Sequence, residues 1–233
     1  MMKNIITIDG PSGAGKGTIT QLVAEEFGWH ILDSGALYRI LGVAAIQQKI
    51  DLSMEPLSQD VQTQIAELAR RLDVDFKLNS INGEVEAYLN GINLSQEIRT
   101  DEAAQWASKV AAITPVREAL LARQRDFDKA PGLVADGRDM GTVVFFDAPV
   151  KIFLTASADC RAKRRYQQLI NKGVGANMRA LLESIQARDE RDKTRSVSPL
   201  VAADDALIVD SSNLTIEQVF SQVIDFAKEK FSK

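Results

Sequence analysis

The chain has 233 residues, of which 45% are hydrophobic and 26% are charged, and its net charge is -4. This is enough for one α/β domain with insertions, and the acidic balance argues against a general nucleic-acid binder. The single cysteine, Cys160, excludes an internal disulfide and makes a thiolate metal cluster implausible, which fits a reducing compartment. The chain enters its first predicted strand within a few residues, and no run reaches the roughly 20 apolar residues of a membrane span. We therefore expect a cytoplasmic protein that binds neither nucleic acid nor membrane. We also expect a monomer, although no feature of the sequence fixes the oligomeric state.

The first predicted element is a buried strand over 4–8, followed by a glycine-rich loop and a helix over 18–27. The loop reads Gly10, Pro11, Ser12, Gly13, Ala14, Gly15, Lys16, Gly17 and Thr18. Glycines let successive N–H groups point inward, the helix N-terminus adds positive potential, and a lysine can reach the outer phosphates of a nucleotide. An ordinary glycine-rich turn is the alternative. Gly17 stands where the general motif has Ser or Thr, so we expect Mg²⁺ to be held mainly by phosphates and water.

The rest of the chain alternates between predicted helices and short apolar strands. Further strands are expected at 29–33, 132–136, 151–155 and 206–210, and helices at 36–49, 58–72, 101–113 and 116–128, with a last helix that ends at about 231. Thr114-Pro115 separates two of these helices, and Thr215 with Gln218 forms a capping-box pattern before the last. Five apolar strands separated by helices predict an α/β fold, with a doubly wound five-stranded parallel sheet whose ligands bind beyond the carboxyl ends of the strands.

An insertion at 73–95 has the period of strands instead. Apolar residues alternate at 74, 76 and 78, at 85, 87 and 89, and at 92 and 94, with Asn82-Gly83 and Asn90-Gly91 between the runs. Asn-Gly between alternating runs is a strong hairpin signal. We predict a small three-stranded antiparallel lobe that shapes or closes over a site.

Polar clusters follow three of the predicted strands. They are the glycine loop, Ser34 with Arg39, and the run 136–139 that includes Arg138 and Asp139. Each cluster alone could be a helix cap or a surface ion pair, but all three are expected at the same edge of the sheet. Asp136 is equally open to two interpretations, one as a group that orients Mg²⁺-bound water and one as a structural residue.

The stretch 157–195 is cationic, with ten Lys and Arg against five Asp and Glu. Two helices are expected with a break at 172–176, and Arg188, Asp192 and Arg195 are spaced to share one helical face. A solvated, salt-bridged helix would explain this composition. A mobile arginine-bearing lid also explains it, since transfer of a phosphate between nucleotides needs added cations and exclusion of water.

Four motifs together resemble bacterial cytidylate kinases, which are nucleoside monophosphate kinases of the P-loop class. They are Gly-Pro-Ser-Gly-Ala-Gly-Lys-Gly-Thr at 10–18, Leu-Asp-Ser-Gly-Ala-Leu-Tyr-Arg at 32–39, Ala-Asp-Gly-Arg-Asp-Met-Gly-Thr at 135–142 and Arg-Asp-Glu-Arg-Asp-Lys-Thr-Arg at 188–195. The resemblance runs nearly end to end. It implies a single P-loop kinase domain over 1–233, with a monophosphate-binding region at 36–115 and a lid at 157–195.

The same resemblance implies the substrates and their sites. ATP would bind residues 10–18, Mg²⁺ would accompany it, and the acceptor would be CMP or dCMP. Lys16, Arg138 and Arg188 are the implied catalytic residues. The residues implied to surround the acceptor are Ser34, Arg39, Ser108, Arg117, Arg138, Asp139, Arg188, Asp192 and Arg195.

The chemistry of cytosine supports part of this assignment. A carboxylate such as Asp139 would accept from the N4 amino group and repel the O4 of uracil, while Ser108 and Arg117 could donate to the ring acceptors. Guanidinium groups suit bidentate contact with phosphate, so Arg39, Arg138 and Arg188 are candidates to hold the acceptor's phosphate. A kinase for UMP or AMP is the near alternative, and a GTPase switch or a non-catalytic nucleotide-binding protein is a remote one.

Overall fold

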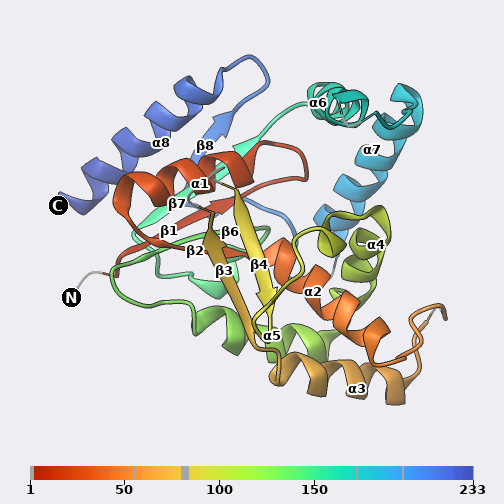
Figure 1. The fold of residues 1–233 in the computed structure, drawn as a ribbon. Coiled ribbons are helices and arrows are strands. Elements are labelled where there is room, and N and C mark those ends of the chain that lie inside the picture. Colours follow the sequence, from red (N-terminus) through yellow and green to blue (C-terminus); the bar gives the residue numbers. More distant parts are fainter. Residues whose placement is uncertain (1–2, 55, 80–83, 172, 196, 233) are drawn as a thin grey trace. The chain divides into compact units, whose positions relative to one another are not determined.

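The structure is a computed structural model that describes residues 3–54, 56–79, 84–171, 173–195 and 197–232 (Figure 1). The chain forms two compact units. Unit 1 comprises Met1–Gly28 and Val134–Lys233, and unit 2 comprises Trp29–Leu133.

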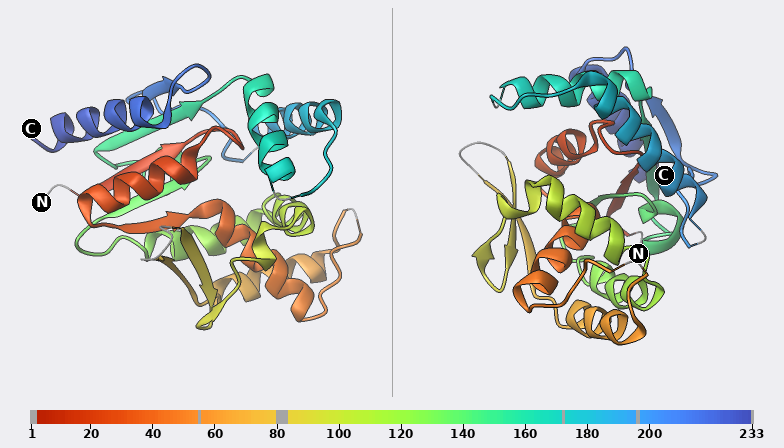
Figure 2. Two further views of the ribbon diagram at one scale, coloured as in Figure 1. Left: turned by 45° about the horizontal axis from the view of Figure 1, so that its top comes forward. Right: turned by 90° about the vertical axis from the view of Figure 1, so that its right-hand side faces the viewer.

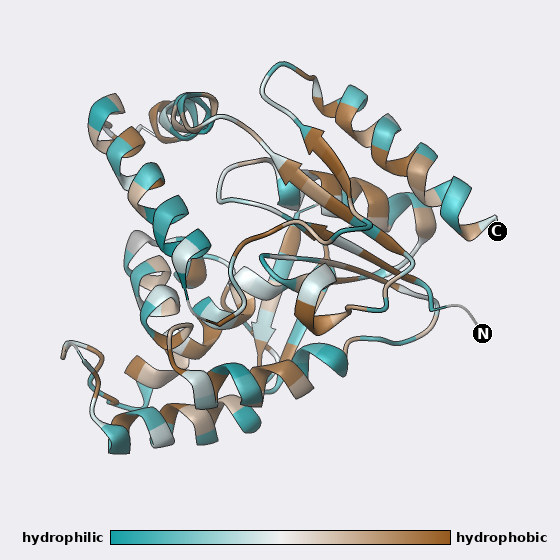
Figure 3. Cartoon of the chain, turned by 180° about the vertical axis from the view of Figure 1, so that it is seen from behind, coloured by the Kyte–Doolittle hydropathy of each residue, from teal (hydrophilic) through white to brown (hydrophobic). Residues whose placement is uncertain are grey.

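The larger sheet has the strand order β2-β6-β1-β7-β8, and β7 pairs in parallel with both β1 and β8. Its strands are β1 (Ile5–Asp9), β2 (His30–Asp33), β6 (Leu133–Gly137), β7 (Val150–Thr155) and β8 (Leu207–Asp210). The predicted five-stranded parallel sheet is therefore confirmed, with each strand within two residues of its expected place. All of β1 is buried, which explains why its sequence is apolar without alternation. Figure 3 shows the same property as brown strands in the larger sheet.

Helices of unit 1 follow the strands as the sequence predicts. They are α1 (Lys16–Phe27), α6 (Ala158–Asn171), α7 (Met178–Thr194) and α8 (Ile216–Phe231), with a π-helical turn η2 (Met140–Val144) after β6. The predicted capping box opens α8, because Thr215 and Gln218 each accept from the other's backbone N–H. Helices α1 and α8 pack together through an edge-to-face contact of Phe27 with Phe231, whose ring centroids are 6.0 Å apart.

Two helices form the cationic stretch of unit 1, as expected, and Figure 2 shows α6 and α7 as a pair. Asn177 caps the start of α7 by accepting from the Ala180 N–H at 3.1 Å. The predicted break between the helices includes Lys172, which lies outside the described residues.

Unit 2 is built around a helical core. Its helices are α2 (Ser34–Gln47), α3 (Gln59–Arg70), the 3-10 turn η1 (Glu97–Arg99), α4 (Asp101–Val110) and α5 (Thr114–Arg125). Apolar residues of these helices, including Leu37, Leu41, Ile65 and Leu120, pack into one buried cluster. The helix α5 begins at Thr114, two residues earlier than the predicted start at 116, and Ile113 is its N-cap.

The predicted three-stranded lobe is confirmed as an antiparallel sheet in unit 2. Its order is β3 (Val74–Leu78), β4 (Val85–Leu89) and β5 (Ile92–Asn93). Asn90 and Gly91 both have positive φ, of 49° and 77°, which fits the tight turn that Asn-Gly predicts. The other predicted turn, Asn82-Gly83, lies outside the described residues. The alternation fails at Ile92, which is 66% exposed in the two-residue edge strand β5.

Candidate functional site

The glycine-rich loop joins β1 to α1 in unit 1, as the sequence predicts. Gly10 has φ of 150°, and a Cβ there would stand 1.9 Å from the Leu154 carbonyl oxygen of β7. Only glycine lets the loop leave β1 this close to a neighbouring strand. Gly13 and Gly15 also have positive φ, so the backbone curls before α1 begins at Lys16.

Carbonyl groups of this loop are held from outside by α6 and by the end of β8. Arg161 donates to the Ser12 oxygen at 3.1 Å, and the Ala14 oxygen accepts from Arg164 at 3.3 Å and from the Ser211 hydroxyl at 3.0 Å. With these oxygens engaged, the loop is held in a conformation in which its N–H groups are the atoms offered to an anion. The sequence reasoning missed all three anchoring residues.

Arg161 also links the loop to helix α7. It is 3% exposed and makes a bidentate pair with Asp189 of α7, with one of its two contacts at 2.9 Å. Asp189 is adjacent to the predicted phosphate-binding residue Arg188. The spacing of Arg161 and Arg164, which puts them on one face of a helix, was the available signal.

Lys16 lies at the start of α1 with 8% exposure, and its ammonium group donates to the Pro11 carbonyl at 3.1 Å. The buried Asp136 carboxylate lies near Gly17, the residue after Lys16. One of its oxygens is 4.0 Å from where a Cβ of Gly17 would stand. Asp136 therefore lies beside the end of the loop at which α1 begins. This position is compatible with an Asp136 that orients Mg²⁺-bound water and equally with a structural Asp136.

The loop after β6 holds the second predicted cluster of unit 1. Arg138 pairs with Asp192 of α7 at 2.8 Å, and both side chains are largely buried, with 17% and 19% exposure. Asp139 is buried, and its carbonyl accepts from the N–H groups of Val143 and Val144 in η2. The structure thus brings together Arg138 and Asp192, which the sequence assigned to one site.

Asp9 lies beneath this loop, and the sequence reasoning assigned it no role. Its two carboxylate oxygens accept from the N–H groups of Met140 at 2.8 Å and Gly141 at 2.7 Å. Burial raises the pKa of Asp9 from 3.8 to about 6. The charge of Asp139 adds to this rise, whereas the two N–H groups and Lys16 oppose it.

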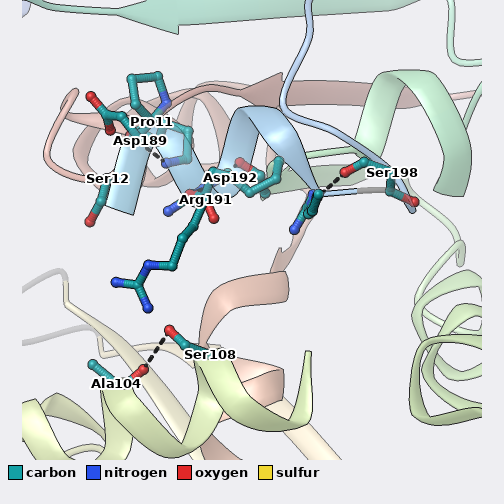
Figure 4. A network of polar contacts seen from close by, with 12 residues as sticks. Pro11, Ser12, Ala104, Ser108, Asp189, Arg191, Asp192 and Ser198 are labelled. Carbon is teal, nitrogen blue, oxygen red and sulfur yellow. Dashed lines mark hydrogen bonds and ion pairs between the residues drawn. The ribbon is translucent and has the colours of Figure 1, made fainter. Parts of the chain in front are cut away.

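Arg195 corrects the predicted helical face. Helix α7 ends at Thr194, and Arg195 is extended, with φ of -61° and ψ of 139°. The chain folds back so that the Leu200 N–H donates to the Asp192 carbonyl at 2.8 Å, which takes the acceptor that another helical turn would use. The Arg195 side chain donates to the Ser198 carbonyl, and a dashed line marks this hydrogen bond at Ser198 in Figure 4. Arg188 and Asp192 remain one turn apart on α7.

Four predicted acceptor residues belong to unit 2, where each has a defined contact. The Ser34 hydroxyl, at the start of α2, donates to Gln124 at 2.7 Å, and Arg39 of α2 donates to the Ile98 carbonyl at 2.8 Å. Arg117 of α5 lies over the Tyr38 ring, 6.0 Å from its centroid.

The Ser108 hydroxyl of α4, which was expected to donate to a ring acceptor of cytosine, donates to the main chain in this structure. Its acceptor is the Ala104 carbonyl, at 3.0 Å (Figure 4). In this arrangement the Ser108 oxygen can accept a hydrogen bond, and it must release Ala104 before it can donate to a ring acceptor. That all of these residues meet one nucleotide remains a prediction.

Metal and membrane features are limited in the described part of the chain. Among the described residues there is no group of three or more His, Cys, Asp or Glu side chains arranged to hold a metal ion. No helix in the described ranges is both long and apolar enough to span a bilayer.

Comparisons with known proteins give a consistent result. The family described as Cytidylate kinase matches residues 6–229. Proteins named cytidylate kinase from Aeromonas salmonicida and Klebsiella pneumoniae are 52% and 54% identical, and in both cases 98% of this chain and 96% of the relative are covered. The cytidylate kinase of a Marinomonas species is 56% identical over 219 residues, which is 94% of this chain and 93% of the relative.

Proposed function

The chain belongs to the cytidylate kinase family and phosphorylates CMP and dCMP, and we propose how the residues described above divide that reaction. The γ-phosphoryl group of ATP passes to a phosphate oxygen of the acceptor, and the products are ADP and CDP or dCDP. Because the acceptor is already an anionic phosphate, the reaction needs no strong general base. Positioning and charge neutralisation supply the catalysis.

The donor site is residues 10–18. Backbone N–H groups of the loop hold the ATP phosphates, and Lys16 neutralises charge on the transferred group. The anchored carbonyls of Ser12 and Ala14 support this assignment, because a preorganised loop does not have to rearrange when phosphate binds.

Mg²⁺ fits this site as an ion held mainly by phosphates and water. Gly17 offers no hydroxyl ligand, and Asp136 is the nearby carboxylate that would hold Mg²⁺-bound water. The ion would neutralise part of the charge on the phosphates when it is bound.

The acceptor site uses arginines for phosphate and Asp139 for the base. We assign Arg39, Arg138 and Arg188 to the phosphate of CMP, and Asp139 to the N4 amino group of cytosine. The single observation that carries this assignment is the partly buried pair of Arg138 with Asp192, because it holds a guanidinium group in place before the substrate arrives. Ser34, Ser108, Arg117, Asp192 and Arg195 complete the assigned set.

Substitutions in the two sites test these roles. Lys16→Ala and Arg188→Ala should each lower kcat by about 100-fold or more while circular dichroism shows a folded protein. Arg179→Ala is the matched control for Arg188→Ala, since Arg179 lies on the same helix, is 88% exposed and pairs across the surface with Glu183. Near-normal turnover in either site variant would contradict the assignment.

We further propose that residues 36–115 form the monophosphate-binding region, that 157–195 act as the lid, and that the protein works as a cytoplasmic monomer. Light scattering after size exclusion should give about the 25.6 kDa of one chain, and a dimer mass would contradict the monomer.

A further inference from the structure

Asp9 is a buried carboxylate that has no assigned role in the phosphoryl transfer. It is the last residue of β1 and the residue before the glycine loop, and it is 5% exposed. Both of its oxygens accept main-chain N–H groups, at 2.8 and 2.7 Å, from residues 131 and 132 positions further along the chain. A two-oxygen contact of this kind fixes both the position and the orientation of the peptide groups that donate to it.

The segment that Asp9 holds is packed tightly on its other sides. A Cβ at Gly141 would stand 2.8 Å from the Thr7 hydroxyl oxygen and 3.3 Å from the Lys151 side chain. Met140 is fully buried, and its carbonyl accepts from the Phe145 N–H at 2.7 Å. Met140 and Gly141 therefore fit against β1 and β7 in one position, and the Asp9 carboxylate fixes that position.

The residues just before this segment are those assigned to the acceptor. Arg138 and Asp139 precede Met140 directly, and the Asp139 carbonyl is bonded into the same η2 turn. A shift of Met140 would therefore move the carboxylate assigned to cytosine and the guanidinium group assigned to phosphate together.

Asparagine could not replace Asp9 without loss. One of its two polar atoms is an NH₂ group, which would face a backbone N–H in a buried site where no water can substitute. The carboxylate is also within electrostatic range of Lys16 on the donor side and of Asp139 on the acceptor side.

We propose that Asp9 is a positioning residue for recognition of the acceptor base, which it serves by clamping the backbone of Met140 and Gly141. The inference rests on the role that the proposed function gives to Asp139. Under this proposal, specificity for the acceptor base depends partly on Asp9, a residue of β1, which is the strand that leads into the glycine-rich loop.

The test compares kcat/KM for CMP and for UMP in three variants. Asp9→Asn should lower the CMP-to-UMP preference at least about tenfold, because one buried N–H loses its acceptor. A purely structural role would lower the active fraction and reduce both rates alike, so the ratio would not move. Asp147→Asn is the control, since that carboxylate lies in the same unit, is 43% exposed and pairs with Lys3 at 2.9 Å; its ratio should equal that of the unsubstituted protein.

Asp139→Asn separates failure of this inference from failure of the proposed function. It should lower the preference by about 100-fold or more. If Asp139→Asn lowers the ratio and Asp9→Asn leaves it unchanged, the positioning role is overturned and the function stands. If Asp139→Asn leaves the ratio unchanged, the assignment of the base to Asp139 is wrong and the positioning role falls with it.

If Asp9→Asn does not fold, amide hydrogen exchange in the unsubstituted protein decides. The N–H groups of Met140 and Gly141 should exchange as slowly as those of β1. Exchange as fast as that of exposed loop residues would overturn the clamp.

Discussion

The pKa of Asp9 provides a sharp physical test of the structure. Burial raises this pKa from 3.8 to about 6, against the opposing effects of the Met140 and Gly141 N–H groups and of Lys16. A rise of about two pKa units corresponds to about 3 kcal/mol of preference for the protonated form in the native state. We therefore expect Asp9 to titrate near pH 6, well above an ordinary aspartate.

The sign of the effect on stability follows from the direction of the shift. Because the native pKa is above the unfolded one, the contribution to stability is complete below about pH 3.8 and is lost as pH rises through about 6. Asp9→Asn cannot titrate. The stability of the unsubstituted protein minus that of Asp9→Asn should therefore fall by about 3 kcal/mol in total between strongly acidic and mildly basic pH, and roughly half of the fall lies between pH 5 and 7.5.

Two assays test this prediction. Both use the protein without nucleotides, because the phosphate of a bound nucleotide also titrates near pH 6. Carbon NMR of the aspartate carboxyl groups gives the pKa of Asp9, with its signal assigned from the spectrum of Asp9→Asn. Urea denaturation followed by circular dichroism gives the difference in stability. A pKa below about 4.5, together with stability curves that stay parallel from pH 5 to 7.5, would refute the proposed burial and contacts.

Three further substitutions test separate contacts. Gly10→Ala should destabilise the protein by more than about 2 kcal/mol, because its Cβ would overlap a carbonyl of the next strand, whereas Gly28→Ala has positive φ but open space and should cost about 1 kcal/mol; equal losses in thermal unfolding would contradict this. Asp192→Asn should raise the KM for CMP about tenfold by releasing Arg138, and an unchanged KM in steady-state assays would show that the pair is not needed for binding. Arg161→Lys should raise the KM for ATP about tenfold, since lysine lacks the planar guanidinium fork that binds both Asp189 oxygens while donating to the Ser12 carbonyl, and an effect on CMP alone would be inconsistent with its place behind the loop.

Local patterns predict the elements of this fold well. The strand, loop and helix over 4–27 follow from a run of apolar residues, a glycine cluster and helical spacing, all of which act within a few residues. The turn at Asn90-Gly91 and the capping box at Thr215 are local for the same reason.

Contacts between distant residues could not be predicted in this way. Asp9 meets Met140 across 131 residues, and Arg161 meets Ser12 across 149 residues. Neither pair has a spacing signal, because the parallel sheet brings the pairs together only after the chain is folded. An Asp at the end of a predicted strand and two arginines on one helical face can be recognised in a sequence. The sequence does not show which distant residues they contact.

The end of α7 shows a further limit of periodicity. The spacing of Arg188, Asp192 and Arg195 fits one helical face, and the first two residues keep it. Arg195 does not, because a hydrogen bond from Leu200 captures the Asp192 carbonyl and ends the helix. Helix termination by a residue eight positions away has no local signature.

A crystal structure with CMP and a non-hydrolysable ATP analogue bound together would test the division of roles most directly. We expect Lys16 on the β- and γ-phosphates, Asp139 against N4 of cytosine, and the guanidinium groups of Arg39, Arg138 and Arg188 on the phosphate of CMP. A complex in which the three arginines contact neither nucleotide would contradict the account.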